Sequence, residues 1–546
     1  TSCHDPGSER YHLLRRLVNA FFRGKDAYEV LRATVALWLF WRLFAKLKWI
    51  MSREGIKAYA INAAMPYIKQ LPPVKRKIEG EMKKTVEDMC RKFGEEVTEP
   101  RSTLPTTGMT EEELVDLMEH RNELDTKHWV SGKITGSIYH GGQAHYDFIG
   151  KIVSKWAFTN PLHPAIHPAL RQMDAEVVQM VINMYNGNGR CCGSFTTGGT
   201  ESILMAMKVY RDWGLAKKGI TEPNIVVCST AHAAFFKAGQ YFNIFVRQCR
   251  ATAEQQVDVR HMQSLIDSNT VAIVGSCCQF ATGAIDPIEE MATLALAKNI
   301  GLHVDCCLGG FLVPFMTKAG FPLPPFDFRV KGVTSISCDP HKYGFAPKGA
   351  SVVMFSDRSW RHHMYSCMPG WTGGIYGTPS MTGSRAGGVV AGTWASMCKF
   401  GEEGYIETTK RIVGATRAMA AGIRQIKGLR IVGRPDVCVV AFDATKESGL
   451  NCYAIADCMR LKFHWDLATC QSPACVHLAV TLPSSQHAER FVDELRESVE
   501  IVAADKLGSY SSTAGLYGMA ASLPAQFIEV GTAAYLDAMS ETQFGT

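Results

Sequence analysis

"SISCDPHKYGFAPKGASVVMF", residues 335–355, is the stretch that decides the fold. It begins and ends with apolar runs typical of buried strands, and three cations, His341, Lys342 and Lys348, lie between these runs. A buried charge is costly unless an opposite charge or hydrogen-bond partners accompany it. We therefore expect two strands joined by a turn, with anionic ligands that neutralise the cations of this turn.

Other apolar runs give the chain an alternating pattern of strands and helices. The expected strands lie at residues 224–229, 271–278, 301–307, 335–338 and 350–355. Residues 286–300 predict a helix, with an acidic start and a lysine near the end. Nearly continuous apolar strands separated by helices predict a mostly parallel sheet covered on both faces. Such sheets bind ligands at the carboxyl ends of their strands.

Bulk composition excludes several classes of protein. The chain has 546 residues, of which 46% are hydrophobic and 20% charged, as in ordinary globular proteins. A net charge of +6 is modest for this length, so we do not expect a nucleic-acid partner. The 18 cysteines show no CxxC…CxxC metal spacing, so no metal site is predicted. Buried free thiols in a reducing compartment fit better than disulfides.

Four features follow the expected strands, and each has a structural alternative. Residues 193–200 predict a glycine-containing loop before a helix, and Gly198 and Gly199 in it predict a phosphate site, although such turns are common. His232 stands just past a strand, where a histidine is more often structural. Asp305 is a carboxylate in an apolar run, which a helix cap or an internal ion pair also explains. Lys342 is either an ion-pair partner or an amine with a lowered pKa, suited to forming a Schiff base.

Together these features match the needs of one cofactor, pyridoxal phosphate. It requires an amine for attachment, an acid at the pyridine nitrogen, a phosphate cup and a flat group against the ring. The chain order of phosphate loop, histidine, aspartate and "HK" resembles fold-type I pyridoxal phosphate enzymes, in particular the group II decarboxylase branch.

Longer motifs narrow the resemblance. "FTNPLHPAIHPALRQMDAEV", "TTGGTESILMA", "AHAAFFKA", "HVDCCLGGF", "DPHKYGFAPKG" and "GGIYGTPSMTGSR" are similar to the sphingosine-1-phosphate lyase family, strongly over residues 114–388. The resemblance implies an α/β chain with the fold-type I transferase fold. Its large domain would carry a mostly parallel seven-stranded sheet, followed by a small C-terminal α+β domain. The domains expected are 1–52, a membrane-associated segment; 53–110, a linker; 111–388, the cofactor-binding domain; and 389–546, the small domain.

The resemblance also implies roles for individual residues. Lys342 would carry the cofactor and take part in catalysis, and the other cofactor contacts would be Asp305 at the pyridinium, His232 and Cys307 on the two ring faces, and Gly199, Thr200 and His341 at the phosphate. The substrate phosphate would bind Tyr139, Asn160, His163, Lys348, Tyr376 and Arg385. Two positions depart from the family pattern: Pro340 replaces a hydroxyl residue, and Thr282 stands where a histidine is expected.

The implied reaction is a retro-aldol cleavage of the C2–C3 bond of a phosphorylated sphingoid base, giving a long-chain aldehyde and phosphoethanolamine. The general base stays open between Lys342 once released, His163, a tyrosine and the substrate phosphate. One alternative is an amino-acid decarboxylase on the same scaffold, because a fold does not determine a function. Another is a membrane-bound lipid-phosphate binding protein that has lost catalysis.

The N-terminal region predicts a helix over residues 13–49 that mixes aromatic and basic residues. Its uninterrupted apolar run, residues 33–41, is far short of the roughly 20 residues needed to span a bilayer. It fits a helix in the membrane interface, a span with snorkelling cations, or a helix docked on a soluble body. The family resemblance implies the endoplasmic reticulum membrane, a catalytic domain facing the cytosol, and a homodimer with the active site at the interface.

Thr110 is the expected N-cap of the helix that opens the catalytic body.

Overall fold

The computed structural model describes residues 24, 26–53, 71–72, 76, 80, 101–505, 508–510 and 525–540. The chain divides into two compact units. One comprises Thr1–Ser102 with Pro524–Thr546 and contains helices α2 (Ala27–Arg53) and α18 (Ala525–Ala538). The other, Thr103–Leu523, contains all the candidate site residues.

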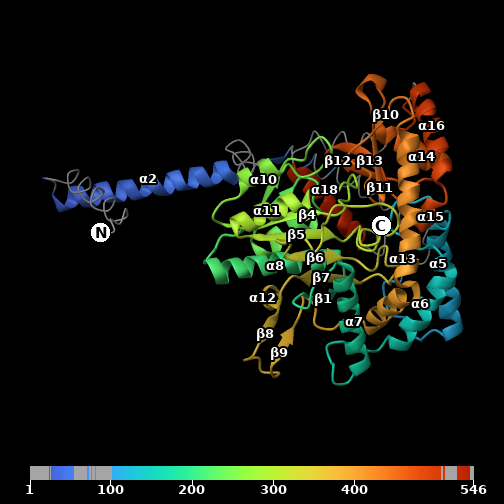
Figure 1. Ribbon diagram of the computed structural model, residues 1–546, viewed down its shortest axis with the longest axis horizontal. Helices are drawn as coiled ribbons and strands as arrows, with labels where there is room; N and C mark the ends of the chain where they lie inside the picture. The colour runs from blue at the N-terminus through green and yellow to red at the C-terminus, as the bar shows by residue number, and fades with distance from the viewer. Residues whose placement is uncertain are drawn as a thin grey trace. The chain divides into compact units, whose positions relative to one another are not determined.

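A seven-stranded sheet forms the centre of the larger unit (Figure 1). In spatial order its strands are β1 (Cys192–Thr196), β7 (Ser351–Phe355), β6 (Ser335–Cys338), β5 (Gly301–Cys306), β4 (Thr270–Ser276), β2 (Asn224–Cys228) and β3 (Phe245–Cys249). Strand β7 is antiparallel to both neighbours, and the remaining neighbours pair in parallel. The mostly parallel seven-stranded sheet is confirmed.

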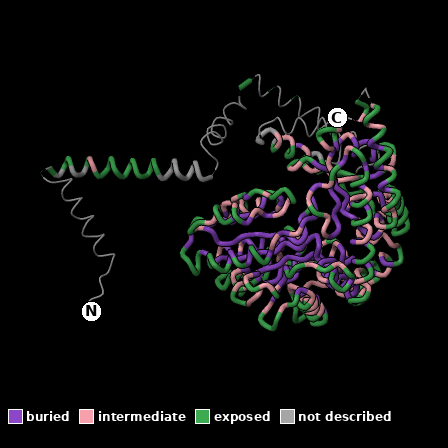
Figure 2. Tube along the Cα trace, turned by 45° about the horizontal axis from the view of Figure 1, so that its top comes forward, coloured by how far each residue is buried: buried purple, intermediate pink, exposed green. Residues whose placement is uncertain are grey.

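Helices cover both faces of this sheet, as the apolar strands predicted. Along β2, Ile225 and Val227 pack in one buried cluster, whereas Val226 and Cys228 pack in the other, as the two-residue period of a strand requires. The first cluster takes its buried helical side chains from α8 (Gly199–Lys218) and α9 (Ala234–Phe242). The second takes them from α7 (Pro168–Met184), α10 (Val259–Leu265), α11 (Ile288–Lys298) and α13 (Gly387–Ile423), and it continues into helices of the C-terminal part. Figure 2 shows the buried strands between the more exposed helices.

Two strands differ from expectation. Residues 193–200 were predicted to be a glycine-containing loop, but their first half forms strand β1, and the helix begins at Gly199. Gly193 is needed in that strand because a Cβ there would lie 2.7 Å from the carbonyl oxygen of Val353 on β7. Strand β3 was not predicted because its sequence, "FVRQC", is polar and half-buried at the edge of the sheet.

The C-terminal part has the expected α+β composition. Its antiparallel sheet has the order β10 (Leu429–Ile431), β11 (Val439–Ala444), β13 (Ala474–Ala479), β12 (Ala468–Gln471). Around this sheet lie α14 (Cys452–Phe463), α15 (Leu482–Ser485), α16 (Ala488–Ala504) and the short 3-10 helix η1 (Lys446–Ser448). The predicted domain boundary at residue 388 falls in the first turn of α13 and stays a prediction.

Three further helices and a two-stranded hairpin precede or flank the site. Helix α5 (Glu111–Trp129) begins at the predicted cap: the Thr110 side chain accepts from Glu113 N, and the Glu113 carboxylate accepts from Thr110 N. Helix α6 is Gln143–Trp156, and the short α12 is Arg358–His362. Strands β8 (Ser366–Met368) and β9 (Tyr376–Thr378) form a separate hairpin.

Helix α2 agrees with the helix expected near the N-terminus over the residues that both cover. Most of the predicted linker, 53–110, lies outside the described residues. Among the helices that are described, none combines the length and the apolar character needed to cross a bilayer.

Candidate active site

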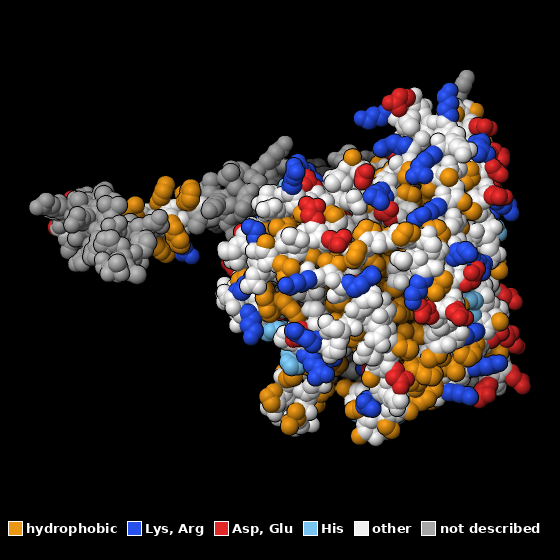
Figure 3. All heavy atoms as spheres, viewed as in Figure 1, with side chains coloured by type: hydrophobic (Ala, Val, Ile, Leu, Met, Phe, Trp, Pro, Cys, Tyr) orange, Lys and Arg blue, Asp and Glu red, His pale blue; other side chains and the backbone are white. Residues whose placement is uncertain are grey.

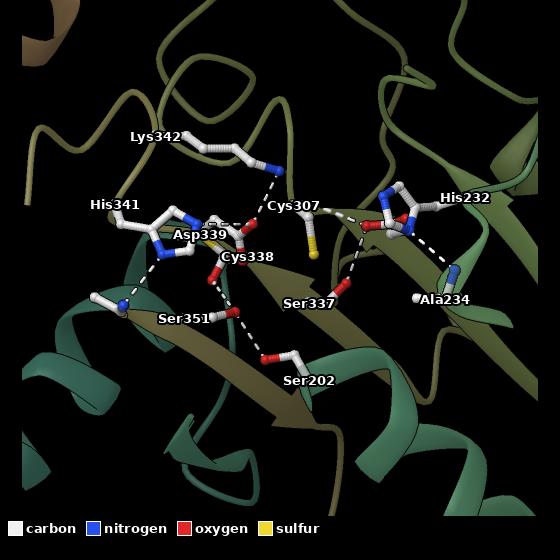
Figure 4. A network of polar contacts seen from close by, with 12 residues as sticks. Ser202, His232, Ala234, Cys307, Ser337, Cys338, Asp339, His341, Lys342 and Ser351 are labelled. Carbon is white, nitrogen blue, oxygen red and sulfur yellow. Dashed lines mark hydrogen bonds and ion pairs between the residues drawn. The ribbon is translucent and has the colours of Figure 1, made fainter. Parts of the chain in front are cut away.

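Five of the predicted site residues line one cavity of about 230 Å³. They are Lys342, Asp305, His232, Cys307 and Tyr139. Asp305 lies near the carboxyl end of β5, His232 follows β2 and Lys342 follows β6, so the parallel strands bring them to one edge of the sheet. Figure 4 shows Lys342, Cys307 and His232 converging on this region.

Lys342 forms an ion pair with Asp339, a partner that the sequence analysis did not identify. Its Nζ lies 2.9 Å from Oδ2 of Asp339, whose side chain is 1% exposed (Figure 4). Burial lowers the pKa of Lys342, but the Asp339 carboxylate outweighs burial and holds that pKa well above its usual value. The lysine is therefore an ammonium, which corresponds to the ion-pair alternative. The other oxygen of Asp339, Oδ1, is buried and has no protein partner among the described residues.

Asp305 remains a carboxylate although it is buried. Its Oδ1 accepts hydrogen bonds from Cys307 N at 3.0 Å and from the Ser337 hydroxyl at 3.2 Å. Burial raises the pKa of Asp305, but electrostatic interactions with His232 and His303 and the hydrogen bond from Cys307 N outweigh burial, so this pKa lies below its usual value. A buried anion of this kind suits a protonated pyridine nitrogen.

The start of α8 forms a narrow cradle. A Cβ on Gly199 would lie 2.7 Å from Asp339 Oδ2 and 2.8 Å from Cys307 Sγ, so only glycine fits there. Thr200 follows as an exposed residue in the first turn, where free backbone N–H groups favour an anion. His341 Nδ1 accepts from Ala350 N at 3.1 Å, and a Cβ on Gly198 would lie 3.6 Å from the His341 ring.

The residues present fit pyridoxal phosphate. The cavity offers an amine at Lys342, a buried carboxylate at Asp305, and flanking groups at His232 and Cys307. Next to Cys307, outside the cavity lining, is the glycine cradle at the N-terminus of a 20-residue helix. The unpaired Asp339 Oδ1 beside that cradle is a polar atom that still needs a donor. Pro340 can supply neither a hydroxyl nor an N–H to a phosphate.

Two predicted substrate-phosphate residues lie together at the edge of the cavity. The ammonium of Lys348 lies 4.6 Å from the centre of the Tyr139 ring, and Tyr139 lines the cavity with Lys342. Burial raises the pKa of Tyr139 to about 12, so its hydroxyl keeps its proton at neutral pH. Lys348 is exposed, and no carboxylate among residues 101–505 forms an ion pair with it.

Of the six substrate-phosphate candidates only Tyr139 lines this cavity, and apart from Lys348 beside it the others lie elsewhere. Asn160 donates from Nδ2 to Ser384 Oγ at 3.0 Å and accepts from Arg385 N at 3.2 Å. The Arg385 guanidinium forms a largely buried ion pair with Asp174 at 2.6 Å. Tyr376 lies on β9, and His163 is an exposed residue whose backbone N–H bonds to Asn160. Their phosphate-binding role stays a prediction.

Glu201 connects Thr197, just before the cradle, to the segment between Tyr376 and Arg385, and the sequence analysis missed it. Its Oε2 accepts from the backbone N–H and the hydroxyl of Thr197, at 2.7 and 2.6 Å. Its Oε1 accepts from Met381 N at 3.1 Å. The only sequence signal was a carboxylate in the first turn of a helix, which an ordinary favourable helix-dipole contact also explains.

Thr282, the second departure from the family pattern, is fully buried. It donates to Gln279 Oε1 at 3.1 Å, and the cavity lining does not include it. Thr282 therefore does not take the place of a histidine at the cavity surface.

Comparisons with known proteins agree with this geometry. The pyridoxal-dependent decarboxylase conserved domain matches residues 98–445. The sphingosine-1-phosphate lyase of Drosophila melanogaster is 39% identical over 518 residues, covering 93% of each chain. The chain belongs to the sphingosine-1-phosphate lyase family.

Two solved structures have folds similar to that of this chain. The sphingosine-1-phosphate lyase of Burkholderia pseudomallei K96243 is similar with a TM-score of 0.72 and 36% identity, over 74% of this chain and 94% of that one. The glutamate decarboxylase of Lactobacillus brevis is similar with a TM-score of 0.65 but 19% identity, over 75% of this chain and 97% of that one. The second likeness shows a shared fold alone, so the decarboxylase alternative is not favoured.

A buried histidine, His303, predicts that the protein loses stability in acid. Burial lowers the pKa of fully buried His303 to about 4, below the ordinary value of 6.5. The unfolded chain binds more protons between these values, so the free energy of unfolding falls as the pH drops through this window, by up to about 3 kcal/mol for this residue. This loss of stability is measured from the denaturant midpoints of wild type and His303→Gln at pH 7.5 and pH 4.5. Wild type should lose more stability than the variant, and equal losses would contradict the prediction.

Proposed function

We propose that the chain cleaves the C2–C3 bond of phosphorylated sphingoid bases, giving a long-chain aldehyde and phosphoethanolamine. Family membership supports a pyridoxal phosphate-dependent lyase. The observation that carries the substrate class is a second cation at the cavity edge: Lys348, over the Tyr139 ring, has no carboxylate partner among residues 101–505. An amino-acid substrate has no phosphate to occupy it, whereas a phosphorylated headgroup does.

When bound, pyridoxal phosphate supplies an electron sink for the pair released from the breaking bond. Lys342 is the attachment point, and Asp305 holds the proton of the pyridine nitrogen. His232 and Cys307 cover the ring faces, while Gly199, Thr200 and His341 hold the cofactor phosphate. Burial lowers the pKa of His341 to about 4, so it acts there as a neutral hydrogen-bonding group.

Proton transfer from the C3 hydroxyl starts the cleavage, and the protonation of nearby groups limits the choice of acceptor. Asp339 keeps a released Lys342 protonated at Nζ, so Lys342 acts as a proton donor. Tyr139, with a pKa of about 12, orients oxygen atoms by donating its hydroxyl proton. His163, another tyrosine and the substrate phosphate are the acceptors that remain. Tyr139 and Lys348 bind the substrate phosphate, with Asn160, His163, Tyr376 and Arg385 as further candidates.

A product assay tests the proposal against its decarboxylase alternative. The holoenzyme is incubated separately with a phosphorylated sphingoid base, glutamate and an aromatic amino acid, and both aldehyde and CO2 are measured. Aldehyde with stoichiometric phosphoethanolamine supports the lyase. Release of CO2 alone would overturn it, and turnover of no substrate by a chain loaded with cofactor would favour a binding protein that has lost catalysis.

Lys348→Ala is predicted to raise KM for the phosphorylated substrate by about 10- to 100-fold. A hydrogen bond to a charged group contributes about 1.5–3 kcal/mol, and Lys348 has no role in attaching the cofactor. Steady-state kinetics and the visible absorbance of the bound cofactor measure both properties. Lys399→Ala is the matched control, because its ammonium lies over the ring of Phe148, which does not line the cavity, whereas that of Lys348 lies over the cavity-lining Tyr139. Loss of cofactor absorbance in Lys348→Ala would mean that this residue is misplaced.

We also propose a homodimer whose active sites lie at the interface. Hydrophobic side chains gather at the β8–β9 hairpin (Figure 3). Among them Met368, Trp371 and Ile375 are 55%, 57% and 92% exposed. Exposed apolar patches of this kind are typical of interaction surfaces, and Tyr376, a candidate for the substrate phosphate, lies in the same hairpin. Light scattering on wild type and Trp371→Asp tests it: a monomeric wild type would contradict the dimer.

The N-terminal segment is proposed to hold the protein at the endoplasmic reticulum membrane with the catalytic domain facing the cytosol. Trp38, Phe40, Trp41 and Phe44 on α2 are all at least half exposed, and Arg42 lies beside them. Aromatic and basic side chains on one helix favour the lipid headgroup region. Flotation of the full chain with lipid vesicles, compared with a Trp38→Asp, Trp41→Asp variant, tests membrane binding. Imaging in cells tests the compartment.

A further inference from the structure

A fully buried histidine stands beside the cofactor-binding carboxylate. His303 precedes Asp305 by two residues on β5, so both side chains lie on the same face of the strand. On β6, Ser335 is the register partner of His303, and Ser337 is the partner of Asp305. His303 Nδ1 lies 2.7 Å from Ser335 Oγ, and its Nε2 lies 3.2 Å from Ser337 Oγ. The imidazole thus bridges two serine hydroxyls that are both 0% exposed.

These contacts belong to a continuous hydrogen-bonded chain. At one end Ser337 Oγ lies 3.2 Å from Asp305 Oδ1, and at the other Ser335 Oγ lies 2.5 Å from the hydroxyl of Tyr210 on α8. The chain therefore runs from a helix on the face of the sheet through two strands to the cavity. None of its members except Asp305 lines that cavity.

The carboxylate sets the direction of every hydrogen bond in this chain. Ionised Asp305 can only accept, so the Ser337 hydroxyl donates to it and must accept in turn from Nε2–H of His303. Burial lowers the pKa of His303 to about 4, so the ring carries one proton, and its Nδ1 accepts from Ser335. Ser335 then accepts from Tyr210, whose pKa burial raises and which therefore keeps its proton. Aligned bonds of this kind polarise one another in a low-dielectric interior.

We propose that His303 is a positioning residue for Asp305. With its proton on Nε2, it directs the Ser337 hydroxyl onto Oδ1 and thereby stabilises the carboxylate that faces the pyridine nitrogen of the cofactor. This inference rests on the role given to Asp305 above, and it extends the cofactor site to residues outside the cavity lining. A purely structural role, in which the same bonds only hold β5 to β6, is the rival explanation.

Binding of two cofactors to the cofactor-free protein separates the two explanations. One is pyridoxal phosphate, and the other is its analogue with carbon in place of the pyridine nitrogen, which cannot pair with Asp305. Wild type should bind pyridoxal phosphate about tenfold more tightly than the analogue, because a hydrogen bond to a charged group is worth at least this much. In His303→Phe this preference should fall about threefold or more, which is the coupling expected between contacting groups. His303→Gln, which retains one donor and one acceptor, should restore most of it.

Two further variants keep the test decisive. Ser337→Ala breaks the same link by removing a single oxygen, so it should lower the preference even where His303→Phe fails to fold. Ser351→Ala removes a hydroxyl that is equally buried but bonds to Ser202 and to the Cys338 carbonyl, away from Asp305 (Figure 4). This control should leave the preference unchanged.

The outcomes distinguish this inference from the assignment on which it rests. Equal weakening of both cofactors in His303→Phe and Ser337→Ala would overturn the positioning role and leave the role of Asp305 intact. A wild type that binds both cofactors equally would overturn both statements. A preference that falls in both variants and returns in His303→Gln supports the inference.

Discussion

Lys342→Ala is expected to abolish turnover, lowering kcat by at least about 1,000-fold. The variant loses the attachment point of the cofactor together with a proton donor, and a positioned acid or base alone contributes about 10²–10⁴-fold. It also leaves Asp339 as a buried carboxylate without its ion-pair partner, so stability should fall as well. The measurements are kcat and the visible absorbance of the protein after incubation with pyridoxal phosphate and gel filtration.

The two readouts separate a chemical defect from a folding defect. Lys348→Ala lies in the same turn and should retain the absorbance that Lys342→Ala loses. Methylamine added to folded Lys342→Ala should restore part of the activity, because it supplies the missing amine. A Lys342→Ala protein with wild-type absorbance after gel filtration would show that another amine carries the cofactor.

Asp305→Asn is expected to lower kcat by about 100- to 1,000-fold while the cofactor stays attached. An amide has nearly the shape of the carboxylate but no charge, so it cannot hold the proton of the pyridine nitrogen. Loss of one preorganised electrostatic contact typically costs this factor. Single-turnover kinetics of the holoenzyme measure the effect.

Asp212→Asn is the matched control for this variant. Asp212 pairs with Lys208 and Arg211 and does not line the cavity, so its loss should leave kcat unchanged. If Asp305→Asn kept wild-type kcat, the carboxylate would not face the ring.

The central strands could be predicted because their composition leaves little choice. Residues 301–306 and 335–338 are short apolar runs bounded by turns, and both became fully buried strands. The edge strand β3 could not be predicted, since one exposed face lets "FVRQC" carry polar side chains. Gly193 suggested a loop, because the sequence alone does not reveal that a neighbouring carbonyl crowds that position.

The site was predictable to the extent that its residues follow strands. Lys342, Asp305 and His232 converge because parallel strands end at one edge. The pairing of Lys342 with Asp339 depends on the turn geometry, and the pairing of Arg385 with Asp174 depends on packing between distant segments. The spacing of these residues in the sequence does not reveal either ion pair. Both ion pairs determine which charged side chains remain available to a ligand.

The Asp339–Lys342 pair affects how readily Lys342 would react with the aldehyde product. The proposed reaction releases an aldehyde, and aldehydes condense readily with unprotonated amines. In this reaction Lys342 would be free of the cofactor while the aldehyde is nearby. Because Asp339 keeps the freed amine protonated, the lysine is a poor nucleophile toward the departing aldehyde. In the proposed reaction, the carboxylate would thus limit capping of the lysine by the aldehyde product.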